Sequence, residues 1–301
     1  MSRPVLAVLG LALNAVVWGL SWWPLRELDA RGLHPLWTTA AVFLFATCVL
    51  TCIRPSGWLG FAQHPQLWWL MLASGLTNVG FNWAVTTGDV VRVVLLFYLM
   101  PTWSLLLAWW LLGERPTRSA LARLGLALLG VVWVLKTPES PWPLPQDLPD
   151  VLALLAGFCF ALTNIWLLRL QHTPASARMI AMFGGGTVMA SACAGIATAT
   201  GLIPALPTMQ ETLQLAATWA PYVLGLSTAF LVSNFTLQYG AARLSAHTTA
   251  MVMMSEVVFA SVSSVALGTS VLTWRIALGG GMIVLAALLA SHTSTSKEIP
   301  P

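Results

Sequence analysis

Apolar residues follow one another along this chain in runs that are long enough to cross a lipid bilayer. A hydrocarbon core needs about 20 apolar residues per helix, and open sheets cannot span lipid because their edge groups would lack hydrogen-bond partners. Charged and proline-rich positions divide the sequence into ten such runs, so we expect an all-α integral membrane protein with ten transmembrane helices. The predicted spans are residues 4–26, 34–53, 67–87, 90–112, 119–136, 151–170, 177–200, 214–239, 244–268 and 274–291.

One connection differs from the other short loops. The segment "KTPESPWPLPQDLPD" from Lys136 to Asp150 is rich in proline and acidic residues, and it separates the runs into two groups of five. Such composition is typical of a linker. We therefore predict one five-helix unit at residues 1–136, a linker at 137–150, and a second five-helix unit at 151–301 that ends in a short tail.

Composition and charge agree with a membrane protein and suggest its orientation. Hydrophobic residues make up 57% of the chain and charged residues 8%, against about a quarter in soluble domains. The net charge is +4, but no basic stripe accompanies it, so we expect no nucleic-acid partner. If the N-terminus is cytoplasmic, nine Lys and Arg residues fall inside and five outside. This predicts that both termini are cytoplasmic and that the linker is periplasmic.

The two groups of five spans look like copies of one unit. "NWAVTTG" at Asn82 matches "NFTLQYG" at Asn234, an offset of 152, and the "LG" at Gly113 matches the "LG" at Gly268, an offset of 155. Because five is odd, the two copies would cross the membrane in opposite directions. Inverted repeats of this kind are usual in alternating-access transporters, whose binding site lies between the halves.

The stretch "YLMPTWSLLLAWWLLGERPT" from Tyr98 to Thr117, within a five-plus-five plan, resembles the EamA-type branch of the drug/metabolite transporter superfamily. The resemblance covers essentially the whole chain. It implies a single-chain carrier of the bacterial inner membrane that exports small metabolites, amino acids or drugs through a central cavity. The second half departs from the pattern, because Glu256 stands where Pro101 stands in the first half and Thr269 replaces the Glu of Leu-Gly-Glu.

Glu256 is the acid that lies deepest in a predicted span. It follows the cytoplasmic start of its run by about twelve residues, or about 18 Å, and so falls near the midplane. A charge there costs about 2.5–3.5 kcal/mol on insertion scales, which makes it a functional candidate. We expect it to bind a proton or a cationic group, on a cavity-facing stripe with Met253, Ala260 and Ser263. The alternative is a structural carboxyl bonded to a neighbouring helix or a fixed cation.

Arg92 is the second charged candidate. It could pair with Asp89 one turn earlier or extend toward the outer surface. Alternatively, its guanidinium could receive a substrate carboxylate. With Glu256 receiving the ammonium, the two charges would suit an amino acid.

Uncharged side chains complete the predicted site. Amides inside a membrane either bond between helices or face a wet cavity, and aromatic rings could stack on a ligand. Pro101 and His247 are predicted hinge or gate residues. The further predicted substrate-binding residues are Asn14, Trp18, Asn78, Asn82, Tyr98, Trp103, Asn164, Asn234, Gln238 and Met253.

These features favour transport over other functions. A membrane enzyme needs a cluster of catalytic groups, and the other histidines are scattered through loops and the tail. The four cysteines lie in apolar runs without a metal-ligating partner, so we expect no cofactor and no metal. The prediction is a secondary transporter that exports small metabolites. Amino acids are the first choice, and drugs or other small amphipathic metabolites are the alternative. The expected partners are the substrate, the lipid bilayer and, with coupling at Glu256, protons. No obligate protein partner is evident.

Overall fold

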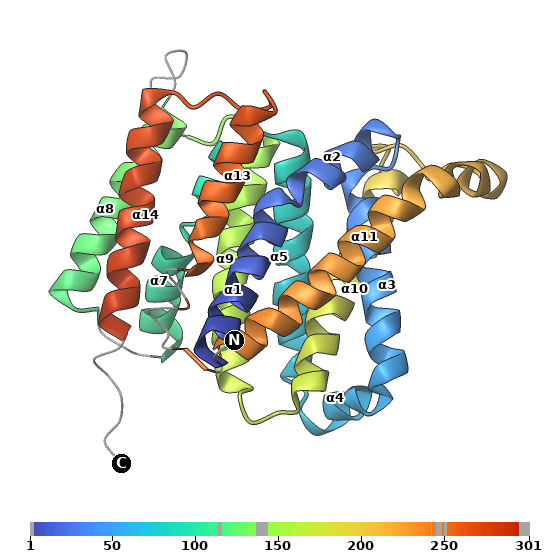
Figure 1. The fold of residues 1–301 in the computed structure, drawn as a ribbon, viewed down its shortest axis with the longest axis horizontal. Helices are drawn as coiled ribbons and strands as arrows, with labels where there is room; N and C mark the ends of the chain where they lie inside the picture. Colours follow the sequence, from blue (N-terminus) through green and yellow to red (C-terminus); the bar gives the residue numbers. More distant parts are fainter. Residues whose placement is uncertain are drawn as a thin grey trace.

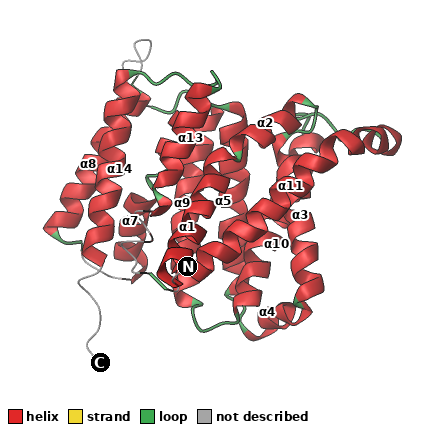
Figure 2. Ribbon diagram, in the orientation of Figure 1, coloured by secondary structure: helices red, strands yellow, loops and turns green. Residues whose placement is uncertain are grey.

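The computed structural model describes residues 3–112, 116–136, 144–241, 243–244, 249 and 252–294, and every regular element in this part of the chain is a helix (Figure 2). This confirms the all-α prediction. The helices are α1 Arg3–Leu20, α2 Trp22–Ala30, α3 Pro35–Ile53, η1 Pro55–Trp58, α4 Leu59–Gln63, α5 Leu67–Thr87, α6 Val90–Phe97, α7 Met100–Leu112, α8 Arg118–Leu135, α9 Leu148–Arg169, α10 Ala175–Ala199, α11 Met209–Ala241, α13 Ser255–Ala266 and α14 Trp274–Ser294.

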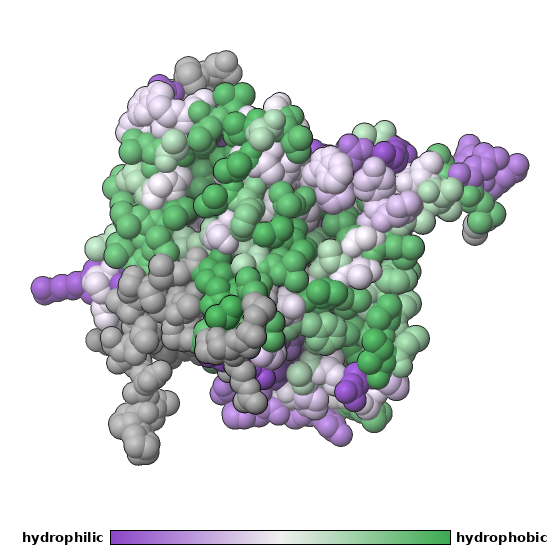
Figure 3. Space-filling view, viewed as in Figure 1, coloured by the Kyte–Doolittle hydropathy of each residue, from purple (hydrophilic) through white to green (hydrophobic). Residues whose placement is uncertain are grey.

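Seven stretches of helix in the described residues are long and apolar enough to cross a membrane. They are Val5–Ala30, Pro35–Ile53, Val90–Leu107, Arg118–Leu135, Leu148–Arg169, Ala175–Ala199 and Gln210–Ala241. Ser255–Ala266 and Trp274–Leu289 are shorter apolar helices. Large apolar side chains such as Leu9, Trp69 and Ile196 are exposed on the outer surface, and Figure 3 shows apolar residues over the middle of one face with polar residues toward its edges. An apolar girdle of this kind is suited to lipid.

Two of the predicted spans that the structure describes in full are not continuous helices. The run 4–26 breaks at Ser21, between α1 and α2, and the run 90–112 breaks at Tyr98 and Leu99, between α6 and α7. A proline follows each break, at Pro24 and Pro101. Proline has no N–H, so the carbonyl four residues earlier loses its helical partner and the helix bends.

Side-chain caps explain where three helices begin. The carboxylate of Asp89 accepts the backbone N–H of Arg92 at 2.9 Å at the start of α6. Thr117 accepts from Ala120 at α8, and Asp147 accepts from Asp150 at α9. Each cap satisfies a backbone donor that the first turn of a helix leaves free.

The helices of the two predicted halves are interleaved (Figure 1). The most extensive pairings join α5 to α9 and α10, α3 to α10, α8 to α14, and α1 to α11 and α13. Glycines permit the closest approaches: a Cβ on Gly130 of α8 would lie 2.6 Å from the carbonyl oxygen of Gly279 on α14, and the reverse contact has the same distance. The core is therefore built between the halves, with blue and orange segments side by side in Figure 1.

Some predicted features lie outside the described residues. They are Gly113 and Glu114 of the Leu-Gly-Glu motif, residues 137–143 of the linker, and the gate residue His247.

Candidate functional site

A cavity of about 350 Å³ lies between the helices at the level of the α6–α7 break. Both predicted halves contribute to its wall. The lining residues are Asn14, Trp18, Phe43, Ser74, Thr77, Asn78, Phe81, Phe97, Tyr98, Met100, Pro101, Phe160, Thr163, Asn164, Met182, Phe183, Asn234, Leu237, Met253, Met254, Glu256 and Ala287. Eight of the predicted substrate-binding residues and the predicted hinge Pro101 are thus brought together.

Glu256 is the acid of this cavity. It lies in the first turn of α13 and is 7% exposed. The hydroxyl of Tyr98, placed by the break between α6 and α7, donates to the Glu256 carboxylate at 3.2 Å and also approaches the Met253 carbonyl at 3.3 Å. No basic side chain is among the described lining residues. Within the part of the chain that the structure describes, the carboxyl group therefore faces the cavity without a fixed cation.

Six further aromatic rings contribute to the wall. Trp18 stacks on Phe230 with a centroid distance of 4.4 Å, and the Phe97 ring lies 4.8 Å from Phe81 and 5.5 Å from Phe160. Because these rings pack against one another, their orientations are fixed before a ligand arrives.

Three lining amides have defined partners. Asn14 donates its Nδ2 hydrogen to the Ser233 carbonyl at 2.9 Å, which ties α1 to α11. Asn78 donates to the Ser74 carbonyl at 2.8 Å. Asn234 accepts at 2.9 Å from Gln238, which does not itself line the cavity.

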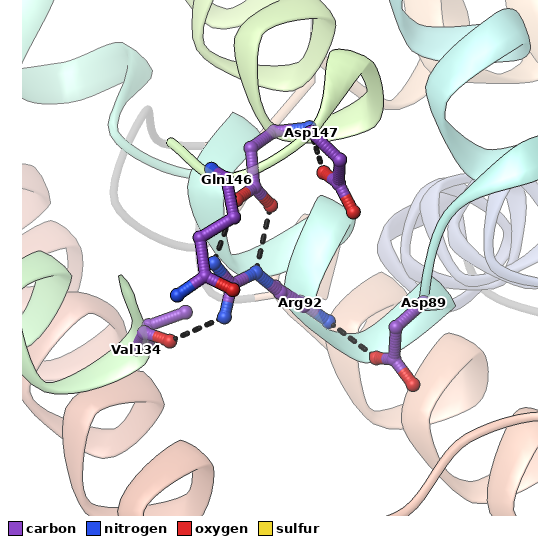
Figure 4. A network of polar contacts seen from close by, with 6 residues as sticks. Asp89, Arg92, Val134, Gln146 and Asp147 are labelled. Carbon is purple, nitrogen blue, oxygen red and sulfur yellow. Dashed lines mark hydrogen bonds and ion pairs between the residues drawn. The ribbon is translucent and has the colours of Figure 1, made fainter. Parts of the chain in front are cut away.

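Arg92 lies away from the cavity, in a polar network between α6, α8 and α9 (Figure 4). Its Nε and Nη2 donate to the two carboxylate oxygens of Asp150 at 2.7 and 2.6 Å, and its Nη1 donates to the Val134 carbonyl at 2.9 Å. Asp89, the expected partner, instead accepts the backbone N–H of Arg92. Two N–H donors of the Arg92 guanidinium are thus already bound to a carboxylate of the protein.

Other predicted residues also lie elsewhere. Asn82 is buried and donates to Thr39 at 3.2 Å, and Trp103 packs edge-on against Phe158 at 5.7 Å. The stripe on α13 faces the cavity only at its start. Its later residue Ser263 accepts from Trp22 of α1, so this part of the stripe packs against a helix.

Sequence reasoning missed two groups of residues. Asp150 was not paired with Arg92, although an arginine within an apolar run needs an acid partner and Asp150 is an acid at the end of the predicted linker. The phenylalanines of the wall, among them Phe81, Phe97 and Phe160, gave no signal because a buried phenylalanine is equally typical of a packed core.

No group of three or more His, Cys, Asp or Glu side chains among the described residues is close enough to hold a metal ion. Nor does the cavity bring a second acid or a histidine to Glu256 within that part of the chain. The arrangement is suited to binding a small molecule between apolar walls and one carboxyl group.

Comparison with known proteins agrees with this arrangement. Residues 5–136 match the EamA-like transporter family. A Pseudomonas aeruginosa protein described as an uncharacterized transporter is 32% identical over 161 residues, which is 50% of this chain and 51% of that protein. The chain therefore spans about half the length of this curated relative in the match.

A solved structure described only as "Crystal structure of protein" covers 98% of this chain and 99% of its own, with a TM-score of 0.53 and 16% sequence identity. At that identity the likeness concerns the fold alone. The family that residues 5–136 match and the Pseudomonas aeruginosa relative are both described as transporters.

Proposed function

We propose that this protein is a secondary transporter that exports small metabolites across the bacterial inner membrane by alternating access. The observation that carries the proposal is the cavity, which lies where the broken helix α6–α7 meets the start of α13. Discontinuous helices near the midplane are the usual way in which transporters build a binding site. Pro101 and Glu256 stand at corresponding positions of the two halves, at an offset of 155, beside these two interruptions.

The pairing of helices supports an inverted repeat of two five-helix units. The first five predicted spans can be matched, in order, with the last five. This matching exchanges α3 with α10 and α8 with α14, so the α3–α10 pair and the α8–α14 pair each map onto themselves. The same exchange turns the α5–α9 pair into α11–α1, and turns α1–α13 into α9–α6, and all of these pairs occur. A contact pattern that survives the exchange is what a two-fold relation between the units predicts, with ten spans in total.

We further propose that both termini are cytoplasmic and that this conformation is closed on the outer side. In that orientation, polar bonds between the two units gather at the outer end: Arg92 with Asp150, Trp219 with the Arg31 carbonyl at 3.1 Å, and Trp22 with Ser263 at 3.0 Å. Alternating access would require these bonds to open when substrate leaves.

Amino acids are the first candidate substrates and amphipathic drugs the alternative. A substrate ammonium would meet Glu256, and protonation of Glu256 would release it, which couples transport to protons. Since Arg92 is bound to Asp150, a substrate carboxylate in the cavity would depend on the lining amides Asn164 and Asn234.

The test is efflux from proteoliposomes that contain the purified full chain and are loaded with labelled amino acids and amphipathic amines. Saturable efflux by the native protein is expected, with a dependence on a pH gradient that Glu256→Gln abolishes. If no solute of either class moves faster than from protein-free vesicles, the proposed function is wrong. If efflux is saturable and Glu256→Gln keeps the same gradient dependence, transport stands and coupling at Glu256 fails.

A further inference from the structure

Most of the polar groups that line the cavity already donate their hydrogens to other groups of the protein. The hydroxyls of Ser74, Thr77 and Thr163 each donate to the backbone carbonyl four residues earlier, at 2.7, 2.9 and 2.9 Å. A hydroxyl that donates to its own helix has only lone pairs left to offer a ligand. These three groups therefore present acceptors to the cavity.

The amides of Asn14 and Asn78 repeat this arrangement. Each NH2 group donates to a backbone carbonyl. Because a carbonyl can only accept, this contact identifies the nitrogen end of each amide and leaves the oxygen as the acceptor that remains. The Asn14 oxygen is buried and has no hydrogen-bond partner among the described residues. A buried acceptor without a donor is costly.

Glu256 adds the charge. The Tyr98 hydroxyl is the one side-chain donor to its carboxylate within the described part of the chain, and an ionised carboxylate has about four acceptor positions. Asn164 and Asn234 are the two lining amides whose NH2 groups form no hydrogen bond with the described residues, and like the indole N–H of Trp18 they are exceptions to the pattern. The cavity is thus rich in acceptors and holds one acid and no base among the lining residues that the structure describes.

We infer that the cavity selects small organic ammonium ions that carry an aromatic or bulky apolar group and lack a carboxylate. The ammonium has three N–H donors and a positive charge, which match Glu256 and the free lone pairs. The apolar part would stack against the rings of Trp18, Phe97 and Phe160. Cation–π attraction between the ammonium and a neighbouring ring face would add to this stacking. The volume of about 350 Å³ is at the small end of the range for ligand pockets, about 300–1,000 Å³.

This inference rests on the proposed function and narrows it. An amino acid carries the same ammonium together with a carboxylate, and the carboxylate would face the Glu256 carboxyl and lone pairs without a cation to receive it. Like charges in a desolvated site repel each other strongly. The zwitterion should therefore bind more weakly than the amine that lacks the carboxylate.

The experiment compares three probes of one skeleton by calorimetric titration of the full chain in detergent: phenethylammonium, phenylalanine and 3-phenylpropionate. We expect phenethylammonium to bind at least about tenfold more tightly than phenylalanine, and 3-phenylpropionate to bind least. Glu256→Gln should abolish the preference. Glu211→Gln is the matched control, because Glu211 is exposed at the start of α11, away from the cavity, and this variant should keep the preference.

Equal or tighter binding of phenylalanine or 3-phenylpropionate to the native protein would overturn the inference, and this comparison needs no variant to fold. The proposed function is judged separately, with the same three probes in proteoliposomes. Selective binding of the amine without any transport would contradict the function and leave the selectivity standing. Saturable transport of phenylalanine with no amine preference would support the function and contradict the selectivity.

Discussion

Two buried acids show how a structural carboxylate differs from one that is available to a ligand. Asp150 is 1% exposed, and its oxygens accept two guanidinium N–H groups from Arg92 and the backbone N–H of Gln146. Glu256 is also buried, but its side-chain donor among the described residues is Tyr98, at 3.2 Å. A carboxylate kept for stability alone is expected to be saturated with donors. The incomplete shell of Glu256 favours the functional interpretation over the structural one.

His34 provides a prediction at the residue scale because it caps α3 only when it is neutral. Its Nδ1 accepts the Leu36 N–H at 3.2 Å, and protonation of Nδ1 would remove that acceptor. Burial lowers the pKa of His34 below its ordinary value of 6.5, although the nearby Asp29 charge acts in the opposite direction. The unfolded chain therefore binds the proton more readily than the folded one. The stability that the cap contributes is complete above pH 6.5 and declines as the pH falls through the lower, folded-state pKa.

The measurement is thermal unfolding in detergent at pH 7.5 and at pH 5, for the native protein and for His34→Asn. Asn is a good N-cap that does not titrate. We expect acidification to cost the native protein up to about 1 kcal/mol more than the variant. An equal loss in both proteins would show that the cap of α3 does not respond to pH.

At the element scale, sequence periodicity and hydropathy predicted helices and failed to predict where two of them break. Residues 4–26 and 90–112 are predominantly apolar, so a hydropathy pattern predicts one span for each. The breaks at Ser21 and Tyr98 depend on backbone hydrogen bonds that Pro24 and Pro101 remove, and on neighbours that accept the bend. Pro101 was predicted to be a hinge from its residue type, but the residue that packs against this break could not be identified without the fold.

That residue is Gly157 of α9, and it gives a prediction about the α6–α7 break. Pro101 has no N–H for the Phe97 carbonyl, and this oxygen lies against Gly157, where an added Cβ would be 2.8 Å away. Because the obstructing atom belongs to the backbone, it cannot move aside cheaply. We expect Gly157→Ala to lower the free energy of unfolding by about 1–3 kcal/mol and to weaken ligand binding through displacement of the neighbouring Tyr98.

Gly125→Ala is the control for this substitution. Gly125 is also helical, in α8, and a Cβ there would meet nothing within 4 Å. Alanine is the better helix former, so this variant should be neutral or slightly stabilising, by up to about 1 kcal/mol. The measurement is thermal unfolding of both variants. Equal changes in stability for Gly157→Ala and Gly125→Ala would show that the contact between Gly157 and the Phe97 carbonyl is not tight.

At the scale of the whole molecule, the interleaving of the two halves goes beyond what the sequence could predict. The repeat "NWAVTTG" and "NFTLQYG" indicates two related units, and it does not say which helix of one packs on which helix of the other. That choice depends on side-chain fit over long separations, as at Gly130 and Gly279. The sequence predicts Glu256 and Asn14 as site residues, and the structure brings both to one cavity. It could not place Arg92, because the partner Asp150 lies 58 positions away.

The Arg92–Asp150 pair yields the last prediction, because it joins α6 and α8 of the first proposed unit to α9 of the second. Removing one member leaves the other charge buried without its partner. Arg92→Met and Asp150→Asn should therefore each lower the free energy of unfolding by about 3–5 kcal/mol. The double variant leaves no unpaired charge, so its loss should be smaller than the sum of the single losses.

The comparison pair is Glu27 with Arg31, whose side chains are 35% and 34% exposed. Water screens such a pair, so Glu27→Gln should cost less than about 1 kcal/mol. Chemical or thermal unfolding of the four variants in one detergent measures all of these differences. If Arg92→Met costs no more than Glu27→Gln, or if the double variant loses the full sum, the buried pair does not hold the two units together. If the double variant recovers stability as expected, the units are joined at this end by one ion pair that a carrier could open without disturbing the cavity.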